Sequence, residues 1–390
     1  MKVLFIVFNQ IGRGTYLRAF ELARALTRLG YKITILASSA QLRKKPKTNR
    51  QNGIQILEVS DLINGPTRSG WDIYNLITRQ RIVKQLDFDL VHGFESRPTV
   101  IYPALALQKQ CTSLFLDWAD WFGSGGSIEE RPNPLIRMLL RPFEDFFETH
   151  YRKKPLGTTA ICKALAQRAI DLGVPQKKIC QLPNGFDVEN WNPISIEKAR
   201  FQLNLDSNQF LVGYLGSLFP KDANLMANTI NLMNSQNQRI RFLHVGHSNY
   251  PIQLRMENAH NIIETGLVDF QKMQTYLSAC DVLLLPFTNS LANNGRFPLK
   301  FSNYLASGRP IIATQVGDIP SYIEAHQCGI VTPANPDALV QAILHLQDYP
   351  QVRLSYGQSA LALSNHPNES WQSRAKTLMK FYIEKIESEK

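Results

Sequence analysis

The chain has 390 residues, 44% of them hydrophobic, which is enough for two packed domains and excludes a disordered or collagen-like chain. Its net charge of +11 is uneven: residues 1–190 carry 27 Lys and Arg against 17 Asp and Glu, whereas residues 191–390 carry 16 against 15. The basic first half favours a polyanionic partner, either an anionic membrane surface, a phosphorylated substrate or nucleic acid. The alternative is an ordinary basic surface without a specific partner.

The apolar start of the chain, Met1–Phe8, runs directly into polar residues without a small-residue cleavage site. We therefore interpret it as a buried strand and not as a signal peptide. No run of 18 apolar residues occurs, so the sequence predicts no transmembrane helix. Five cysteines without a C-x-x-C pair predict neither a zinc site nor a disulfide framework, and they favour a reducing, cytoplasmic location. They are Cys111, Cys162, Cys180, Cys280 and Cys328.

Strand and helix patterns alternate in the first half. A helix is predicted over Thr15–Leu29, with Leu17, Phe20 and other apolar residues at helical spacings. Alternation of this kind predicts βαβ units and a parallel sheet covered on both faces. The predicted strands are Val3–Phe8, Lys32–Ala37, Ile54–Val59, Leu90–Val91, Ser113–Leu116, Gly157–Ile161 and Lys178–Leu182.

The second half repeats this alternation, after a break near Leu182–Pro193. An amphipathic helix is predicted over Trp371–Ile386. Two doubly wound halves would bind a ligand beyond the carboxyl ends of their strands, in a cleft between them. The predicted strands are Phe210–Leu215, Ile240–Val245, Asn261–Glu264, Val282–Leu285, Pro310–Thr314 and Gly329–Val331.

Two loops have features of anion sites. Gly12-Arg13-Gly14 follows a strand and opens a helix, where free backbone amides could meet a phosphate or a sugar oxygen; a plain tight turn is the alternative. Within 281–320, a polar loop precedes Pro298-Leu299-Lys300, which opens a helix that Gly308 ends. The amides of that helix would favour a diphosphate with Lys300 as the counter-charge, unless Lys300 is an ordinary exposed lysine.

The segment 132–154 mixes apolar and aromatic residues with Arg137, Arg141, Arg152, Lys153 and Lys154. Such a segment can lie on an anionic lipid surface, with basic side chains among the headgroups. The alternative is a helix whose apolar face packs into the core.

Four segments together resemble the retaining glycosyltransferase family 4, or group 1, enzymes: PNGFDVENWNP, LVGYLGS, GLVDFQKMQTYLSACDVLLLPF and PLKFSNYLASGRPIIATQVGDIP. The resemblance implies a GT-B fold of two Rossmann-like domains, with an acceptor-binding domain over 1–187 and a nucleotide-sugar-binding domain over 188–367. A helix within 368–390 would cross back to the first domain. It also implies a nucleotide-sugar co-substrate, no cofactor and no metal.

The resemblance suggests donor-binding positions in the second half. Ser217 replaces the family's phosphate-binding arginine after Gly216, and Lys221 matches its phosphate-binding lysine. Both of the family's glutamates are missing, because Gly295 and Asn303 occupy their places; Asn303 can still bond ribose hydroxyls. Loss of the first glutamate puts donor-sugar recognition and activity in question. The full set of expected donor contacts is Gly14, Ser217, Lys221, Gly266, Val268, Gly295, Arg296, Phe297, Pro298, Lys300 and Asn303.

In the first half, Asp117 or Asp120 stands where the family has a histidine beside the reacting sugar. A carboxylate there could orient the acceptor, and it could equally cap a turn. The expected catalytic residues are thus Asp117, Asp120 and Lys300. His92 matches a strand-end histidine of the family, with a structural role as the alternative. The expected acceptor-side residues are Gly12, Arg13, His92 and Glu95.

The sequence therefore predicts a retaining hexosyltransferase that uses a nucleotide sugar and a lipid-linked or saccharide acceptor. We expect it in the cytoplasm, with peripheral contact to the inner face of the plasma membrane through its basic half. Nucleic acid is not an expected partner, because no aromatic–basic RNA motif or zinc finger occurs. The alternatives are a nucleotide-sugar epimerase or hydrolase, and a catalytically degenerate protein that docks on membranes.

Overall fold

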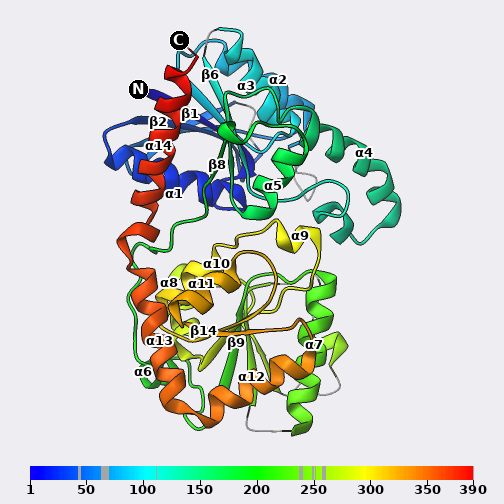
Figure 1. Ribbon diagram of the computed structural model, residues 1–390, viewed down its shortest axis with the longest axis vertical. Coiled ribbons are helices and arrows are strands. Elements are labelled where there is room, and N and C mark those ends of the chain that lie inside the picture. Colours follow the sequence, from blue (N-terminus) through cyan, green and yellow to red (C-terminus); the bar gives the residue numbers. More distant parts are fainter. Residues whose placement is uncertain are drawn as a thin grey trace. The chain divides into compact units, whose positions relative to one another are not determined.

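The protein is described by a computed structural model, which covers residues 1–42, 45–62, 70–110, 112–236, 240–247, 250, 252–256 and 261–389 (Figure 1). Cys111 lies outside the described residues. The chain divides into two compact units. The first comprises Met1–Asn184, Gly295–Phe297 and Trp371–Lys390, and the second comprises Gly185–Asn294 and Pro298–Ser370.

An eight-stranded sheet forms the centre of the first unit, in the order β3-β4-β2-β1-β5-β6-β7-β8. Its strands are β1 Lys2–Gln10, β2 Lys32–Ser38, β3 Lys47–Gln51, β4 Ile54–Val59, β5 Leu90–Phe94, β6 Ser113–Trp118, β7 Gly157–Ala160 and β8 Ile179–Gln181. Its helices are α1 Thr15–Arg28, α2 Ile73–Val83, α3 Pro98–Gln108, α4 Pro134–His150, α5 Lys163–Asp171 and α14 Trp371–Glu387. Short 3₁₀ turns include η1 Ser127–Glu130 and η2 Gln176–Lys178.

A six-stranded sheet forms the centre of the second unit, in the order β11-β10-β9-β12-β13-β14, with every pairing parallel. Its strands are β9 Phe210–Leu215, β10 Ile240–Val245, β11 Ile262–Glu264, β12 Val282–Leu285, β13 Ile311–Thr314 and β14 Gly329–Thr332. Its helices are α6 Ile196–Gln202, α7 Pro220–Gln236, α8 Phe270–Ala279, α9 Leu291–Asn294, α10 Lys300–Ala306, α11 Ile319–His326, α12 Pro336–Asp348 and α13 Pro350–Ser364. Its described residues also form the 3₁₀ turns η3 Ile252–Arg255 and η5 Pro367–Glu369.

Central strands in both units are continuous apolar runs because helices cover both of their faces. In β1, every residue from Val3 to Phe8 is buried, and the same holds for Val282–Leu285 of β12. Helices α1 and α14 pack together, as do α2 and α3, and Figure 1 shows helices flanking each sheet. The prediction of two doubly wound α/β domains is confirmed.

Two features of the first unit differ from the sequence pattern. The edge strand β3, Lys47–Gln51, pairs antiparallel with β4 and carries mostly exposed polar side chains, which give no strand signal. On α1, Leu17 is 40% exposed, whereas its neighbour Arg18 is buried. The spacing of the apolar residues therefore did not predict that this helix buries a charged side chain.

Candidate functional site

Three glycines gather at the carboxyl edge of the second sheet, where β9, β10 and β11 end. Gly216, Gly246 and Gly266 all have positive φ angles, of 90°, 123° and 65°. Gly216 donates its amide to Val245, and Gly246 bridges to Gly266. A Cβ at Gly246 would lie 3.1 Å from the Cα of Gly216, so only glycine allows these loops to approach this closely. The arrangement exposes backbone at the edge where doubly wound sheets bind ligands.

Lys300 lies at this same edge. It is the first residue of α10, in agreement with the prediction that Pro298-Leu299-Lys300 opens a helix. Its Nζ donates to Tyr214 Oη at 2.6 Å and lies 4.0 Å from the centre of that ring. A Cβ at Gly216 would be 3.6 Å from Nζ, which places the ammonium group beside the glycine loop. A half-buried positive charge next to open backbone suits an anionic ligand.

The other donor positions of the second unit surround these residues. Ser217 follows β9 and donates its hydroxyl to the His247 carbonyl, and Lys221 is exposed in the first turn of α7. Gly266 has open space where a side chain would be, and Val268 is half-buried two residues later. Asn303, also half-buried, lies one turn after Lys300 on α10.

Sequence reasoning missed the residues that hold the loop after β12. Asp222, buried on α7, accepts hydrogen bonds from the Thr288 amide at 2.8 Å and the Thr288 hydroxyl at 2.7 Å, and from Asn293 at 3.0 Å. Tyr214 was missed as well, and its hydroxyl donates to the Ser217 carbonyl. The signal for Tyr214 was an aromatic residue with a hydroxyl group near the end of a predicted buried strand, two residues before Gly216.

In the first unit, the predicted acceptor-side residues lie on or directly after β1 and β5, and the predicted catalytic Asp117 and Asp120 lie at the end of the adjacent strand β6. Gly12, Arg13 and Gly14 are exposed after β1. Gly14 has φ 54° and precedes α1, and a Cβ there would lie 2.7 Å from the Asn9 amide nitrogen. Asn9 caps the helix by accepting from the Thr15 amide, so the tight approach has a structural purpose.

Asp117 lies in a buried ion pair. Its two carboxylate oxygens accept from Nε and Nη2 of Arg18 at 3.0 and 2.9 Å, and it also accepts from the Thr159 hydroxyl. Arg18 keeps the pKa of Asp117 below its usual value against the opposing effect of burial. Arg18 also donates to Asn184 and the Leu182 carbonyl, tying α1 to the end of β8. A catalytic role for Asp117 stays a prediction.

His92 is fully buried between Tyr382 of α14 and Thr159 of β7. Burial lowers the pKa of His92 to about 4, so the imidazole is neutral at physiological pH. Its contacts link β5 to α14 and β7, which fits the structural alternative for this residue.

Glu95 and Asp120 stand on neighbouring loops. Glu95 is buried with φ 73°, an uncommon backbone conformation for a side chain of this size, and it accepts from the Ala119 amide and from Arg152. Burial raises the pKa of Glu95 to about 8; Arg152 opposes this rise and Asp120 adds to it. Asp120 leaves 36% of its side chain exposed and is the accessible carboxylate of the two.

Gly295, Arg296 and Phe297, expected as donor contacts, are grouped with the first unit. Arg296 forms a paired contact with both carboxylate oxygens of Glu130, and its Nε lies 3.6 Å from Asp120. The Phe297 carbonyl accepts from Asn184 at 2.7 Å. Pro298 belongs to the second unit, where its carbonyl accepts from the Phe301 amide.

Within the described residues, no three His, Cys, Asp or Glu side chains are grouped as metal ligands would be. No described helix has both the length and the apolar character needed to cross a membrane. The expectation that Arg152 presents its charge to a surface is wrong, because its side chain is fully buried against Glu95.

Comparison with known proteins matches two family models. Residues 209–348 match "Glycosyl transferases group 1", and residues 14–190 match "Glycosyltransferase Family 4". The chain is 25% identical over 209 residues to alpha-galactosylglucosyldiacylglycerol synthase of Streptococcus pneumoniae, covering 50% of this chain and 53% of that protein. It is 34% identical over 56 residues to a putative teichuronic acid biosynthesis glycosyltransferase of Bacillus subtilis, 14% of either chain. The chain thus spans about half or less of the curated relatives that it matches.

Solved structures share the fold over nearly the whole chain. Sucrose-phosphate synthase from Thermosynechococcus elongatus aligns over 100% of both chains, with a TM-score of 0.76 and 15% identity. The Anabaena protein HepE in complex with UDP-glucose aligns over 98% of this chain and 100% of its own, with a TM-score of 0.71 and 16% identity. These likenesses establish the GT-B fold.

Proposed function

We propose that this chain, whose two halves match glycosyltransferase family models, transfers a hexose from a nucleoside diphosphate sugar to a hydroxyl group of a cell-envelope, polysaccharide or lipid-linked acceptor. In this reaction the bond between the anomeric carbon and the diphosphate breaks, and a bond to the acceptor oxygen forms. The acceptor hydroxyl loses its proton and the nucleoside diphosphate leaves. We propose that the sugar retains its anomeric configuration and that no metal ion is required.

The observation that carries this proposal is the position of Lys300 beside the Gly216 loop. Negative charge grows on the diphosphate as it leaves, and a preorganised ammonium group stabilises that charge more in the transition state than in the ground state. Lys221, exposed at the start of α7, is the second cation proposed for the diphosphate. That HepE binds UDP-glucose in a similar fold supports a nucleotide-sugar donor here.

We assign the nucleoside end of the donor to Gly266, Val268 and Asn303. The open space at Gly266 leaves backbone groups accessible to a base. The half-buried Asn303 amide has a donor and an acceptor for ribose hydroxyls, in place of the carboxylate that the family resemblance leads one to expect.

We further propose contact with an anionic membrane through α4. Six large apolar side chains on this helix are 43% to 64% exposed, and their spacing puts them on one side of it. Arg137 and Arg141 lie on the same helix, and Lys153 and Lys154 are exposed just after it. The apolar residues are Leu135, Ile136, Met138, Leu139, Phe143 and Phe146. A relative named for the synthesis of a glycosylated diacylglycerol supports a lipid acceptor.

The test is a screen of the full chain with a panel of nucleotide sugars and a cell-envelope lipid extract as acceptor. Mass spectrometry would detect the released nucleotide together with a product heavier by one hexose, and the anomeric proton coupling would report retention. Turnover should survive removal of divalent ions by a chelator. Donor consumption at an equal rate without acceptor would instead identify an epimerase or hydrolase. Failure to bind any nucleoside diphosphate would identify a docking protein.

A further inference from the structure

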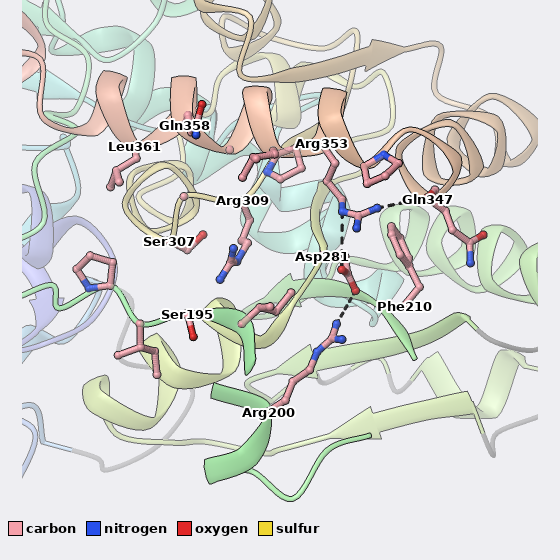
Figure 2. Close-up of a pocket in the computed structure, with 18 of the residues that line it drawn as sticks. Ser195, Arg200, Phe210, Asp281, Ser307, Arg309, Gln347, Arg353, Gln358 and Leu361 are labelled. Carbon is pink, nitrogen blue, oxygen red and sulfur yellow. Dashed lines mark hydrogen bonds and ion pairs between the residues drawn. The ribbon is translucent and has the colours of Figure 1, made fainter. Parts of the chain in front are cut away.

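The second unit has a cavity of about 730 Å³ (Figure 2), which lies at the opposite edge of its sheet from the glycine loops. Its lining includes Phe210 at the start of β9, Asp281 directly before β12, and Ser307–Pro310 directly before β13. Because these strands are parallel and four to six residues long, the cavity lies at their amino ends, roughly 13–20 Å from the carboxyl edge. It is therefore separate from the proposed donor site.

Three arginines and one buried acid line this cavity. Arg200 of α6 donates from Nη2 to Asp281 at 2.6 Å, and Nε of Arg353 of α13 lies 3.8 Å from the other carboxylate oxygen. Asp281 thus balances one of three positive charges in the lining. Glu197 also acts to raise the pKa of Arg309, but its side chain is exposed and does not line the cavity.

Arg309 is the arginine that points into the open space, as Figure 2 shows. Its Nε and Nη2 both donate to a single acceptor, the Ser278 carbonyl, at 3.2 and 2.7 Å. Its Nη1 has no hydrogen bond to any residue in the described part of the chain. Arg309 is half-buried, and burial lowers the pKa of its guanidinium. A sheltered cation with unused donors is costly unless an anion can share the site.

Arg353 supports the same conclusion from the other side of the cavity. Its Nη1 donates to the carbonyl of Leu346 at 2.6 Å, and its guanidinium lies 5.2 Å from the Phe210 ring centre. These contacts hold the planar group in place and leave Nη2 without a hydrogen bond to the described residues. Guanidinium groups held in this way suit the oxygens of a phosphate.

We propose that this cavity binds a small phosphate monoester, with the phosphate between Arg309 and Arg353. The two unbalanced positive charges match the charge of about −2 that a phosphate monoester carries at neutral pH. The volume lies within the range of small-molecule sites and exceeds what a phosphate ion alone would fill. Leu354, Leu361 and Pro350 provide apolar surface for the organic part.

Titration calorimetry of the full chain tests this with glucose 6-phosphate, inorganic phosphate and glucose as probes. UDP is present at saturation, so that phosphate binding at the donor site is suppressed. We expect glucose 6-phosphate to bind, inorganic phosphate to bind about tenfold more weakly, and glucose not to bind. Arg309→Gln should weaken binding of glucose 6-phosphate by at least about tenfold, and Arg309→Lys should restore part of it. The exposed Lys272→Gln is the control and should bind as the wild type does.

If Arg309→Gln does not fold, as judged by circular dichroism, Arg353→Gln takes its place, with the same tenfold loss expected. Absence of binding at 10 mM glucose 6-phosphate, on the order of the weakest useful affinity, would overturn the proposal. So would binding that saturating UDP abolishes, or binding that neither variant weakens. Equal affinity for inorganic phosphate would overturn the assignment to an ester.

Discussion

The ammonium nitrogen of Lys300 lies 2.6 Å from the hydroxyl oxygen of Tyr214, whose own proton is donated to the Ser217 carbonyl at 2.8 Å. The direction of both hydrogen bonds is thereby fixed: Tyr214 accepts from Lys300 and donates to Ser217. The lysine charge is held over the tyrosine ring and beside Gly216. The ammonium group carries three protons, and Tyr214 accepts one of them.

Replacing Lys300 by alanine should reduce turnover by ~30- to 1000-fold, on the order of 2–4 kcal/mol of transition-state stabilisation, because it removes a cation from the proposed leaving group. Binding of UDP, measured by calorimetry, should weaken as well. The exposed Lys272→Ala on α8 is the control and should keep full activity. Turnover of Lys300→Ala within about threefold of the wild type would mean that the donor site lies elsewhere.

Tyr214→Phe should have a smaller effect, about three- to tenfold in kcat/KM. The ring remains beneath Lys300, whereas the hydroxyl that orients its ammonium group is lost. Thermal unfolding should shift by only a few degrees, since the phenylalanine fills nearly the same volume. A loss as large as that of Lys300→Ala would indicate that the Tyr214 hydroxyl itself contacts the substrate.

His92 should make stability depend on pH. Its pKa of about 4 in the folded protein lies below the ordinary value of 6.5, so its contribution is fully present above pH 6.5 and is lost as the pH falls toward 4. The loss amounts to about 3 kcal/mol when protonation is complete in both states. Glu95 makes stability depend on pH in the opposite direction. Its pKa is raised from 4.5 to about 8, so its contribution to stability is lost as the pH rises from 4.5 to about 8.

The two slopes overlap, so the measurement must compare variants. The free energy of unfolding of His92→Gln, followed by urea denaturation from pH 4 to 7, should fall less steeply toward acid than that of the wild type. The exposed His326→Gln on α11 should reproduce the wild-type profile. Identical slopes for His92→Gln and the wild type would show that His92 does not titrate as proposed.

The exposed side of α4 should be required for binding to anionic vesicles. Leu139→Ser combined with Phe143→Ser removes two large apolar side chains from this side, and co-sedimentation should decrease at least about tenfold. The matched control is Phe201→Ser in the second unit, a residue 84% exposed, which should not change binding. Binding should also decline with salt, because screening shortens the reach of the basic residues to about 8 Å at physiological ionic strength.

Retention of vesicle binding by the double variant would exclude α4 as the contact. Equal binding to neutral and anionic vesicles would exclude the electrostatic part of the proposal. Either result leaves the proposed transfer reaction unaffected, because that reaction is tested by product formation and not by vesicle binding.

Buried strands were the best predicted part of the fold. Ile54–Val59, Phe210–Leu215, Ile240–Val245 and Val282–Leu285 have the same bounds in the structure as in the sequence prediction. Strands covered on both faces are continuous apolar runs, and such runs are visible in a single sequence. The edge strand β3, Lys47–Gln51, was missed because an exposed edge needs no apolar side chains.

Site residues were harder to predict, because burial of charge depends on partners far away in the sequence. Arg18 and Asp117 are 99 positions apart, and each satisfies the other in the core. A sequence pattern shows Asp117 as a strand-end carboxylate available for chemistry, and Arg152 as part of a basic surface cluster. Only the fold reveals that Asp117 is buried against Arg18 and that Arg152 is buried against Glu95.

The position of α14 has a consequence for synthesis on the ribosome. This helix completes the first unit, yet it follows the whole second unit in the chain. Until it emerges, His92 lacks its Tyr382 partner, and the Phe115 ring, whose centre lies 5.8 Å from that of Phe381, remains uncovered. The nascent first unit therefore carries an open aromatic surface while nearly two hundred further residues are translated, and its folding is completed only after the second unit has had time to form.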